Sequence, residues 1–164
     1  MTSLSLRGAQ RRGSLSQLMN KPAFEPSLKG RALRLLSQRE HSRLELERKL
    51  SPHETEPGQL AKALDELQAR GFINEERVIE SVIHRRGAKL GTARLKQELQ
   101  AKGLSGEAVT EALAELSGTE MERAREVWAR KFGESATDPK ERARQVRFLI
   151  SRGFAAEVVR KIVG

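Results

Sequence analysis

The sequence predicts an all-α protein: three tandem three-helix repeats that form an elongated, curved array, preceded by a disordered basic N-terminal tail. Three observations lead to this prediction. Leu and Ala dominate the apolar residues and aromatic residues make up only 4% of the chain, a composition that favours helices. Apolar side chains recur at intervals of three and four residues, as on one face of a helix. The same order of helix, break, helix, glycine and helix then returns further along the chain.

Residues 1–27 form the predicted tail. Before Glu25 this segment carries no acidic residue, and Gly8, Gly13 and Pro22 would interrupt a helix. Its Arg and Ser content is also typical of an organelle transit peptide, although it lacks the long apolar centre of a secretory signal. The composition favours a disordered tail.

The first repeat is predicted at residues 28–73. Its first helix is followed by a capping box, in which the Ser42 hydroxyl and the Glu45 carboxylate bind free N–H groups at the start of the second helix. Pro52 limits the second helix, and Gly71 follows the last turn of the third. The apolar positions of these helices are Ala32, Leu33, Leu35, Leu36, Leu46, Leu50, Leu60, Leu64 and Leu67.

The second repeat is predicted at residues 74–118 and the third at residues 119–164. In the second repeat, Asn74, Thr92 and Ser105 are placed to cap the three helices in turn. Glycines separate the helices at Gly87, Gly91 and Gly103. In the third repeat, Trp128 and Phe132 are expected to anchor the core.

Counterparts at a fixed spacing support the repeats. Five leucines of the first repeat have apolar counterparts 49 residues later. They are Leu46, Leu50, Leu60, Leu64 and Leu67, matched by Leu95, Leu99, Val109, Leu113 and Leu116. Seven positions of the second repeat have counterparts 50 residues later. They are Val78, Val82, Leu99, Gly103, Leu104, Glu107 and Val109, matched by Trp128, Phe132, Leu149, Gly153, Phe154, Glu157 and Val159. A repeat of about 45 residues is near the lower limit for an independent core, so each should lean on its neighbours.

The composition narrows the possible functions. The chain has no cysteine, which excludes disulfides, thiolate metal sites and a Cys nucleophile. The three histidines lie far apart in the sequence, without the spacing of metal ligands, and are expected to be ordinary surface or capping residues. No Ser or Thr is marked as a nucleophile by a general base and an orienting group. Glu75 and Glu76 are expected to interact with a helix dipole rather than to act as an acid/base pair. We therefore expect no catalytic residue, no cofactor, no metal and no membrane span.

A net charge of +9 favours an anionic partner, and the stretch HRRGAKLGTARLK concentrates this charge. A phosphate-binding loop is excluded because a helix rather than a strand precedes the glycines and because the lysine lies before Gly91 and Thr92. The glycines fit a joint between two helices. The cations fit either a nucleic-acid contact or a solvated charged turn. The candidate contact residues here are Arg85, Arg86, Lys89, Arg94 and Lys96.

The third repeat adds further candidate contacts at Arg144, Arg147, Arg152, Arg160 and Lys161. The basic stripe that Arg144 and Arg147 begin is incomplete, because the next position on that helix face is Ser151. Nearby acidic residues dilute the charge of this segment further. Some of these cations are expected to pair with acids at helical spacing.

Several segments, in this order, resemble the RecX family of bacterial recombination regulators. ALRLLSQREHSRLELERKL resembles the opening of the family pattern, LQARGFINEER its junction, and KFGE and FLISRGFAAEVVRKIV its C-terminal repeat. The resemblance covers residues 28–164. One departure is Val78-Ile79, where the family usually has Phe-Ala, and this apolar exchange leaves the expected fold intact.

The resemblance implies a regulator that binds the RecA recombinase filament on DNA, lies in its helical groove and restrains its ATPase, strand-exchange and co-protease activities. It implies a cytoplasmic location and contact with DNA, direct or through the filament, and we expect a monomer. The residues alone leave a second possibility open: a helical protein that binds single- or double-stranded DNA directly without sequence preference.

Overall fold

The computed structural model describes residues 25–164 as a chain of helices, and the greater part of the predicted N-terminal tail, residues 1–24, lies outside this range. Within the described residues the structure has nine α-helices, one short 3₁₀ helix and no strand. The all-α prediction is therefore confirmed for this part of the chain.

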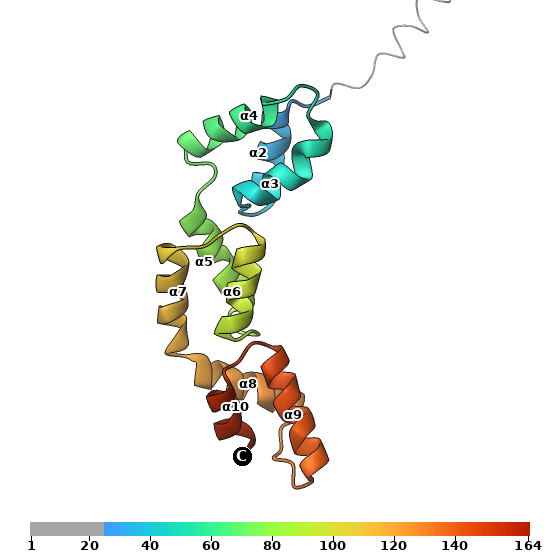
Figure 1. The fold of residues 1–164 in the computed structure, drawn as a ribbon, viewed down its shortest axis with the longest axis vertical. Coiled ribbons are helices and arrows are strands. Elements are labelled where there is room, and N and C mark those ends of the chain that lie inside the picture. Colours follow the sequence, from blue (N-terminus) through green and yellow to red (C-terminus); the bar gives the residue numbers. More distant parts are fainter. Residues whose placement is uncertain (1–24) are drawn as a thin grey trace, which may run out of the picture.

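The helices form three consecutive three-helix units, stacked end to end in an elongated and curved array (Figure 1). Unit 1 comprises α2 (Leu28–Gln38), α3 (Arg43–Leu50) and α4 (Gln59–Ala69), with η1 (Ser51–His53) after α3. Unit 2 comprises α5 (Glu75–Arg86), α6 (Thr92–Ala101) and α7 (Glu107–Ser117). Unit 3 comprises α8 (Glu120–Lys131), α9 (Pro139–Ser151) and α10 (Ala156–Val163).

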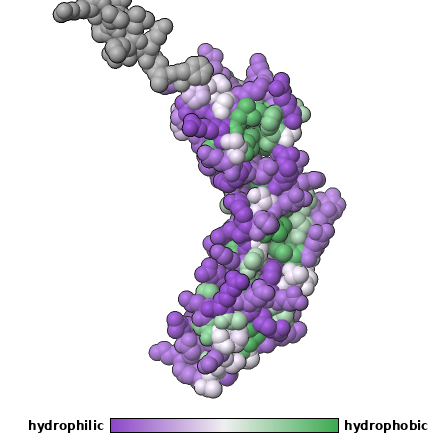
Figure 2. Space-filling view, turned by 180° about the vertical axis from the view of Figure 1, so that it is seen from behind, coloured by the Kyte–Doolittle hydropathy of each residue, from purple (hydrophilic) through white to green (hydrophobic). Residues whose placement is uncertain are grey.

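Each unit has its own small hydrophobic core. Leu46, Leu64 and Leu67 are fully buried in unit 1, Leu95 and Leu99 in unit 2. The core of unit 3 is formed by Ala124, Leu149, Phe154, Val159 and Val163. Outside these cores the surface is largely hydrophilic, with separate apolar areas on the units (Figure 2). Small separate cores agree with a repeat in which neighbouring units support one another.

Two of the predicted helix caps are present as expected. Ser42 Oγ accepts a hydrogen bond of 3.2 Å from Glu45 N, and Asn74 Oδ1 accepts one of 3.0 Å from Arg77 N. The reciprocal half of the capping box is wrong. Glu45 turns its carboxylate to Lys102 and Arg39 instead, because these cations bind it more strongly than a backbone N–H group would.

Two other predicted caps are wrong by one residue. The N-cap of α6 is Gly91 rather than Thr92, and the N-cap of α7 is Gly106 rather than Ser105. For α6 the reason is visible: the backbone N–H of Thr92 donates to the carboxylate of Glu120, 3.0 Å away in the next unit. A partner from a distant helix replaces the local cap.

The predicted register of the third repeat holds for two of its helices and fails for the first. α5 begins at Glu75 and α8 at Glu120, which places their starts 45 residues apart rather than 50. Trp128 lies only partly buried against the core, and its Nε1 donates to Gln145 Oε1 at 2.9 Å. Phe132 is the C-cap of α8 and packs edge-on against another aromatic ring, outside the core. The connection between α8 and α9 is two residues longer than that between α5 and α6, and α9 is three residues longer than α6, which together account for the difference.

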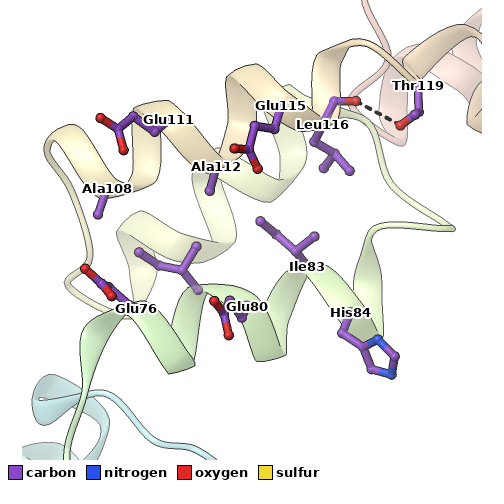
Figure 3. A pocket seen from close by; sticks show the side chains of 11 residues that line it. Glu76, Glu80, Ile83, His84, Ala108, Glu111, Ala112, Glu115, Leu116 and Thr119 are labelled. Carbon is purple, nitrogen blue, oxygen red and sulfur yellow. Dashed lines mark hydrogen bonds between the residues drawn. The ribbon is translucent and has the colours of Figure 1, made fainter.

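In unit 2, the first and third helices leave a groove between them that opens to solvent (Figure 3). Its apolar side chains come from both helices, and four glutamates border it.

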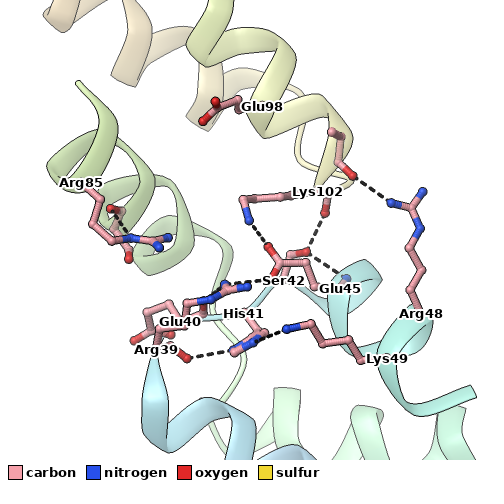
Figure 4. A network of polar contacts seen from close by, with 12 residues as sticks. Arg39, Glu40, His41, Ser42, Glu45, Arg48, Lys49, Arg85, Glu98 and Lys102 are labelled. Atoms are coloured by element: carbon pink, nitrogen blue, oxygen red, sulfur yellow. Dashed lines mark hydrogen bonds and ion pairs between the residues drawn. The ribbon is translucent and has the colours of Figure 1, made fainter. Parts of the chain in front are cut away.

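Units 1 and 2 are joined by a network of polar contacts around Glu45 (Figure 4). The Glu45 carboxylate pairs with Lys102 of unit 2, and its Oε2 lies 2.8 Å from Arg39 Nη1. Ser42 Oγ donates to the Lys102 carbonyl at 2.7 Å, and Arg48 Nη1 donates to the Ala101 carbonyl at 3.1 Å. Burial opposes ionisation of Glu45, but the two cations outweigh it and hold the pKa of this carboxyl below its ordinary value.

His41 lies inside this network, so the expectation that every histidine is a surface or capping residue is wrong for this one. Only 1% of its surface is exposed. Lys49 Nζ lies 3.3 Å from His41 Nε2 and His41 Nδ1 lies 3.0 Å from the Arg39 carbonyl, an arrangement that suits a neutral ring with its proton on Nδ1. Burial, with two neighbouring cations, lowers the pKa of His41 below its ordinary value of 6.5.

We expect acid to destabilise the chain first through His41. Its pKa is lowered by folding, so below pH 6.5 the unfolded chain binds a proton that the folded chain resists, and the free energy of unfolding should fall as the pH falls. One such proton sets a slope of at most about 1.4 kcal/mol per pH unit. Urea unfolding between pH 7.5 and 5.5 measures it. His41→Gln should flatten the slope, whereas His84→Gln, at an exposed position, should leave it as in the wild type. Equal slopes in all three proteins would contradict this role.

Candidate nucleic-acid interface

The stretch HRRGAKLGTARLK connects α5 to α6 and packs directly on unit 3. Gly91 N donates to the Arg152 carbonyl at 2.8 Å, and Ala93 N donates to the Gly153 carbonyl at 3.3 Å. A Cβ added to Gly91 would lie 2.2 Å from the Gly153 carbonyl, and Gly153 itself has a φ of +88°. Two backbones therefore meet here without side chains between them, and the predicted joint between helices is also the junction between units.

Two side chains of α8 hold the joint. Arg123 Nη1 donates to the carbonyls of Leu90 and of Gly87, the latter at 2.7 Å. Burial lowers the pKa of the Arg123 guanidinium, although Glu120 partly offsets this. Glu120, only 8% exposed, accepts the N–H at the start of α6. These bonds satisfy backbone groups that the end of one helix and the start of the next leave free.

At this junction the structure gathers six cations around one aromatic ring, and we refer to this surface as the basic cleft. It is made of two adjoining hollows that share Phe148 and Arg152. One acidic residue, Glu126, also lines it. The cations are Arg86, Lys89, Arg94, Arg130, Lys131 and Arg152.

Phe148 organises the cleft. The Arg152 guanidinium carbon lies 5.0 Å from the centre of the Phe148 ring and Lys131 Nζ lies 5.5 Å from it. Phe132 packs edge-on against the same ring, with 5.4 Å between ring centres. Cations placed on an aromatic face are attracted by it and keep their charged ends at the surface. The ring thus holds two cations beside each other despite their mutual repulsion.

Five of the six cations of the cleft form no ion pair within residues 25–164. The exception is Arg86, whose Nη2 lies 2.8 Å from Glu98 Oε1, and the Glu98 carboxylate raises the pKa of Arg86. The cleft therefore keeps a strong positive charge. Charged groups of this kind, spread over two units, can bind phosphates that follow one another along a nucleic-acid backbone.

Of the ten candidate contact residues, the structure brings together Arg86, Lys89, Arg94 and Arg152. Arg85 lies toward the junction with unit 1 (Figure 4), where its Nε donates to the Ser81 carbonyl. The other five are exposed and line neither hollow of the cleft: Lys96, Arg144, Arg147, Arg160 and Lys161.

Sequence reasoning missed three residues of the cleft: Arg130, Lys131 and Phe148. The two cations end α8, the helix whose register was misplaced. One signal for the third was present, because Phe148 on α9 and Arg152, the C-cap of that helix, are four residues apart and lie on the same face.

Residues 25–164 offer little for other kinds of chemistry. No group of three His, Asp or Glu residues within them could hold a metal ion. None of the helices formed by these residues is long and apolar enough to cross a membrane.

Comparison with known proteins gives a consistent result for all three units. Three family models match in order: "RecX, first three-helix domain" over residues 29–67, "RecX, second three-helix domain" over residues 74–113 and "RecX, third three-helix domain" over residues 119–163.

Full-length relatives and solved structures agree with the family models. The "Regulatory protein RecX" of Leptothrix cholodnii is 53% identical over 144 residues, which cover 88% of this chain and 90% of that protein. The protein of the same name from Ralstonia nicotianae is 48% identical over 84% of this chain and 86% of that one. The crystal structure of RecX from Lactobacillus salivarius has a similar fold, with a TM-score of 0.65 at 20% identity over 83% of this chain and 92% of that one.

Proposed function

Because the chain belongs to the RecX family of regulatory proteins, we propose that it binds the RecA recombinase filament on DNA and inhibits its ATPase, strand-exchange and co-protease activities. It would do so in the cytoplasm and as a monomer. The basic cleft carries the proposal, since six cations at the junction of two units form a surface suited to the phosphates of filament-bound DNA.

The shape of the molecule supports the same proposal. Three units in line can contact several protomers of a helical filament at once (Figure 1). Several weak contacts on one chain give an affinity that none of them has alone. Regulation by occupying the groove of a filament needs no catalytic group.

The second candidate function is direct, sequence-independent binding of DNA, and the cations of the basic cleft favour this function as well. Binding to bare single-stranded DNA should be compared with binding to the same DNA coated by recombinase and ATP, across a salt series. Tighter binding to the filament together with slower ATP turnover supports the regulator. Equal or weaker binding to the filament, with a steep dependence on salt for bare DNA, favours the direct DNA binder.

We expect the cleft to account for most of the electrostatic part of binding. Replacing Lys89, Arg94, Arg130 and Lys131 with Ala should weaken filament binding by about tenfold or more and should lower the salt dependence, because each lost phosphate contact reduces the slope by roughly 0.7 to 0.9. The replaced residues are exposed, so helicity should be retained. Filament binding across a salt series measures both effects.

The matched control removes the same charge outside the cleft, by replacing Arg85, Lys96, Arg147 and Lys161 with Ala. Under the proposal this variant keeps most of its affinity. If the two variants lose affinity equally, only the net charge matters and the cleft is not the contact.

A further inference from the structure

The groove of unit 2 carries a charge opposite to that of the basic cleft, and we refer to it as the acidic groove. It is an open groove of about 640 Å³ between α5 and α7 (Figure 3). Its apolar lining is formed by Ile79, Ile83, Ala112 and Leu116. Two carboxylates from each helix border it, namely Glu76 and Glu80 on α5 and Glu111 and Glu115 on α7.

None of these four carboxylates takes part in an ion pair among residues 25–164, although the chain has a net charge of +9. Some glutamates outside the groove pair with cations, as Glu66 does with Lys29 and Glu98 with Arg86, whereas others, such as Glu122, do not within the described part of the chain. The acidic groove therefore keeps its negative charge, and a phosphate backbone would be repelled from it.

The repeat itself does not require these acids. α4, α7 and α10 are equivalent helices, aligned by their buried apolar residues, and the position of Glu111 is taken by Lys62 in unit 1 and by Lys161 in unit 3. Glu115 corresponds to Glu66, whose charge is met by Lys29. The charge of the groove is thus a property of unit 2 and not of the fold.

We infer that the acidic groove docks a basic amphipathic helix of the protein component of the filament, while the basic cleft faces the DNA. This inference rests on the proposed function. An apolar stripe of such a helix fits the apolar lining, and its Lys and Arg side chains fit the four carboxylates. α7 has 11 residues, a length of about 16 Å, which leaves room for three turns of a partner helix. Ala108 and Ala112, one turn apart on α7, permit a close approach.

Neutralising the groove separates protein contact from DNA contact. The variant Glu80→Gln, Glu111→Gln and Glu115→Gln should bind the recombinase filament about tenfold more weakly. Its affinity for bare single-stranded DNA should stay the same or rise, because negative charge is removed. Both affinities should be measured with the full chain at one salt concentration.

The control variant Glu56→Gln, Glu122→Gln and Glu157→Gln removes the same charge at exposed positions outside the groove and should keep filament binding. Equal loss in both variants, or no loss in the groove variant, overturns the inference. A wild-type chain that binds the filament no better than bare DNA overturns the proposed function too. The wild-type measurement alone shows which has failed.

A photo-crosslinker placed at Ala108 identifies the occupant of the groove. Benzoylphenylalanine at this exposed position should crosslink to recombinase when the chain is bound to the filament. A crosslink to DNA overturns the inference. A crosslink to residues 1–24 of the same chain, which include four cations and no acid, overturns it as well, since the groove would then belong to the chain's own N-terminal segment.

Discussion

Replacing Leu99 with Asp should unfold unit 2 and should also reduce the helical content of the neighbouring units. Leu99 is 0% exposed in the core of this unit. The substitution leaves a cavity, which costs about 2 to 5 kcal/mol, and it buries a carboxylate without a partner. The free energy of unfolding of a native protein is about 5 to 15 kcal/mol, so one such substitution can cancel most of it. The far-ultraviolet circular dichroism signal measures the loss.

The position of the damaged unit should determine how far the loss spreads. Unit 2 contacts both of its neighbours, whereas unit 3 contacts only one. In a linear repeat, stability depends on the interfaces between neighbouring units. Leu149→Asp in unit 3 should therefore remove roughly a third of the helical signal, and Leu99→Asp in unit 2 should remove distinctly more than that. The control is Ile150→Asp, one residue further along α9, whose side chain is 44% exposed. Its helicity should be retained. Equal losses for Leu99→Asp and Leu149→Asp would contradict neighbour coupling.

The sequence was sufficient to predict the class of fold because helical periodicity and capping are local. Ser42 and Asn74 cap their helices as predicted, and Gly71 has the positive φ, 79°, expected after a helix. The prediction failed where a distant residue competes with a local one. Thr92 lost its role as a cap because Glu120, 28 residues further along, binds its backbone N–H group. Contacts between units are not encoded in local spacing.

The candidate site shows the same limit. The cations of the joint were visible as a run, but a run does not show which of them face the same way. Arg86 and Arg94 meet Arg152 only because the turn after α9 packs on Gly91. Arg85 is adjacent to Arg86 in sequence and lies toward the other junction (Figure 4). The structure therefore shows two charged surfaces, the basic cleft and the acidic groove. Only cations of the first were predicted from the sequence.

The backbone contact between Gly91 and Gly153 should be the second most sensitive point of the molecule. In Gly91→Ala the new methyl group would lie 2.2 Å from the Gly153 carbonyl, and the neighbouring atoms are backbone, which cannot move aside as a flexible side chain can. Units 2 and 3 must separate, and the hydrogen bonds from Gly91 and Ala93 are lost. Overpacking and two lost hydrogen bonds together cost about 3 kcal/mol.

This substitution tests the basic cleft without removing a charge. The cleft combines side chains of two units, so their separation should weaken filament and DNA binding although every Arg and Lys is retained. Urea unfolding measures the stability, and amide hydrogen exchange at Phe154 reports the loosened turn. Gly118→Ala is the matched control, because its added methyl group would meet only the Glu115 carbonyl, at 3.6 Å. That variant should keep both stability and binding. If Gly91→Ala also kept both, the units would not meet through their backbones, and the cleft would have to be built by one unit alone.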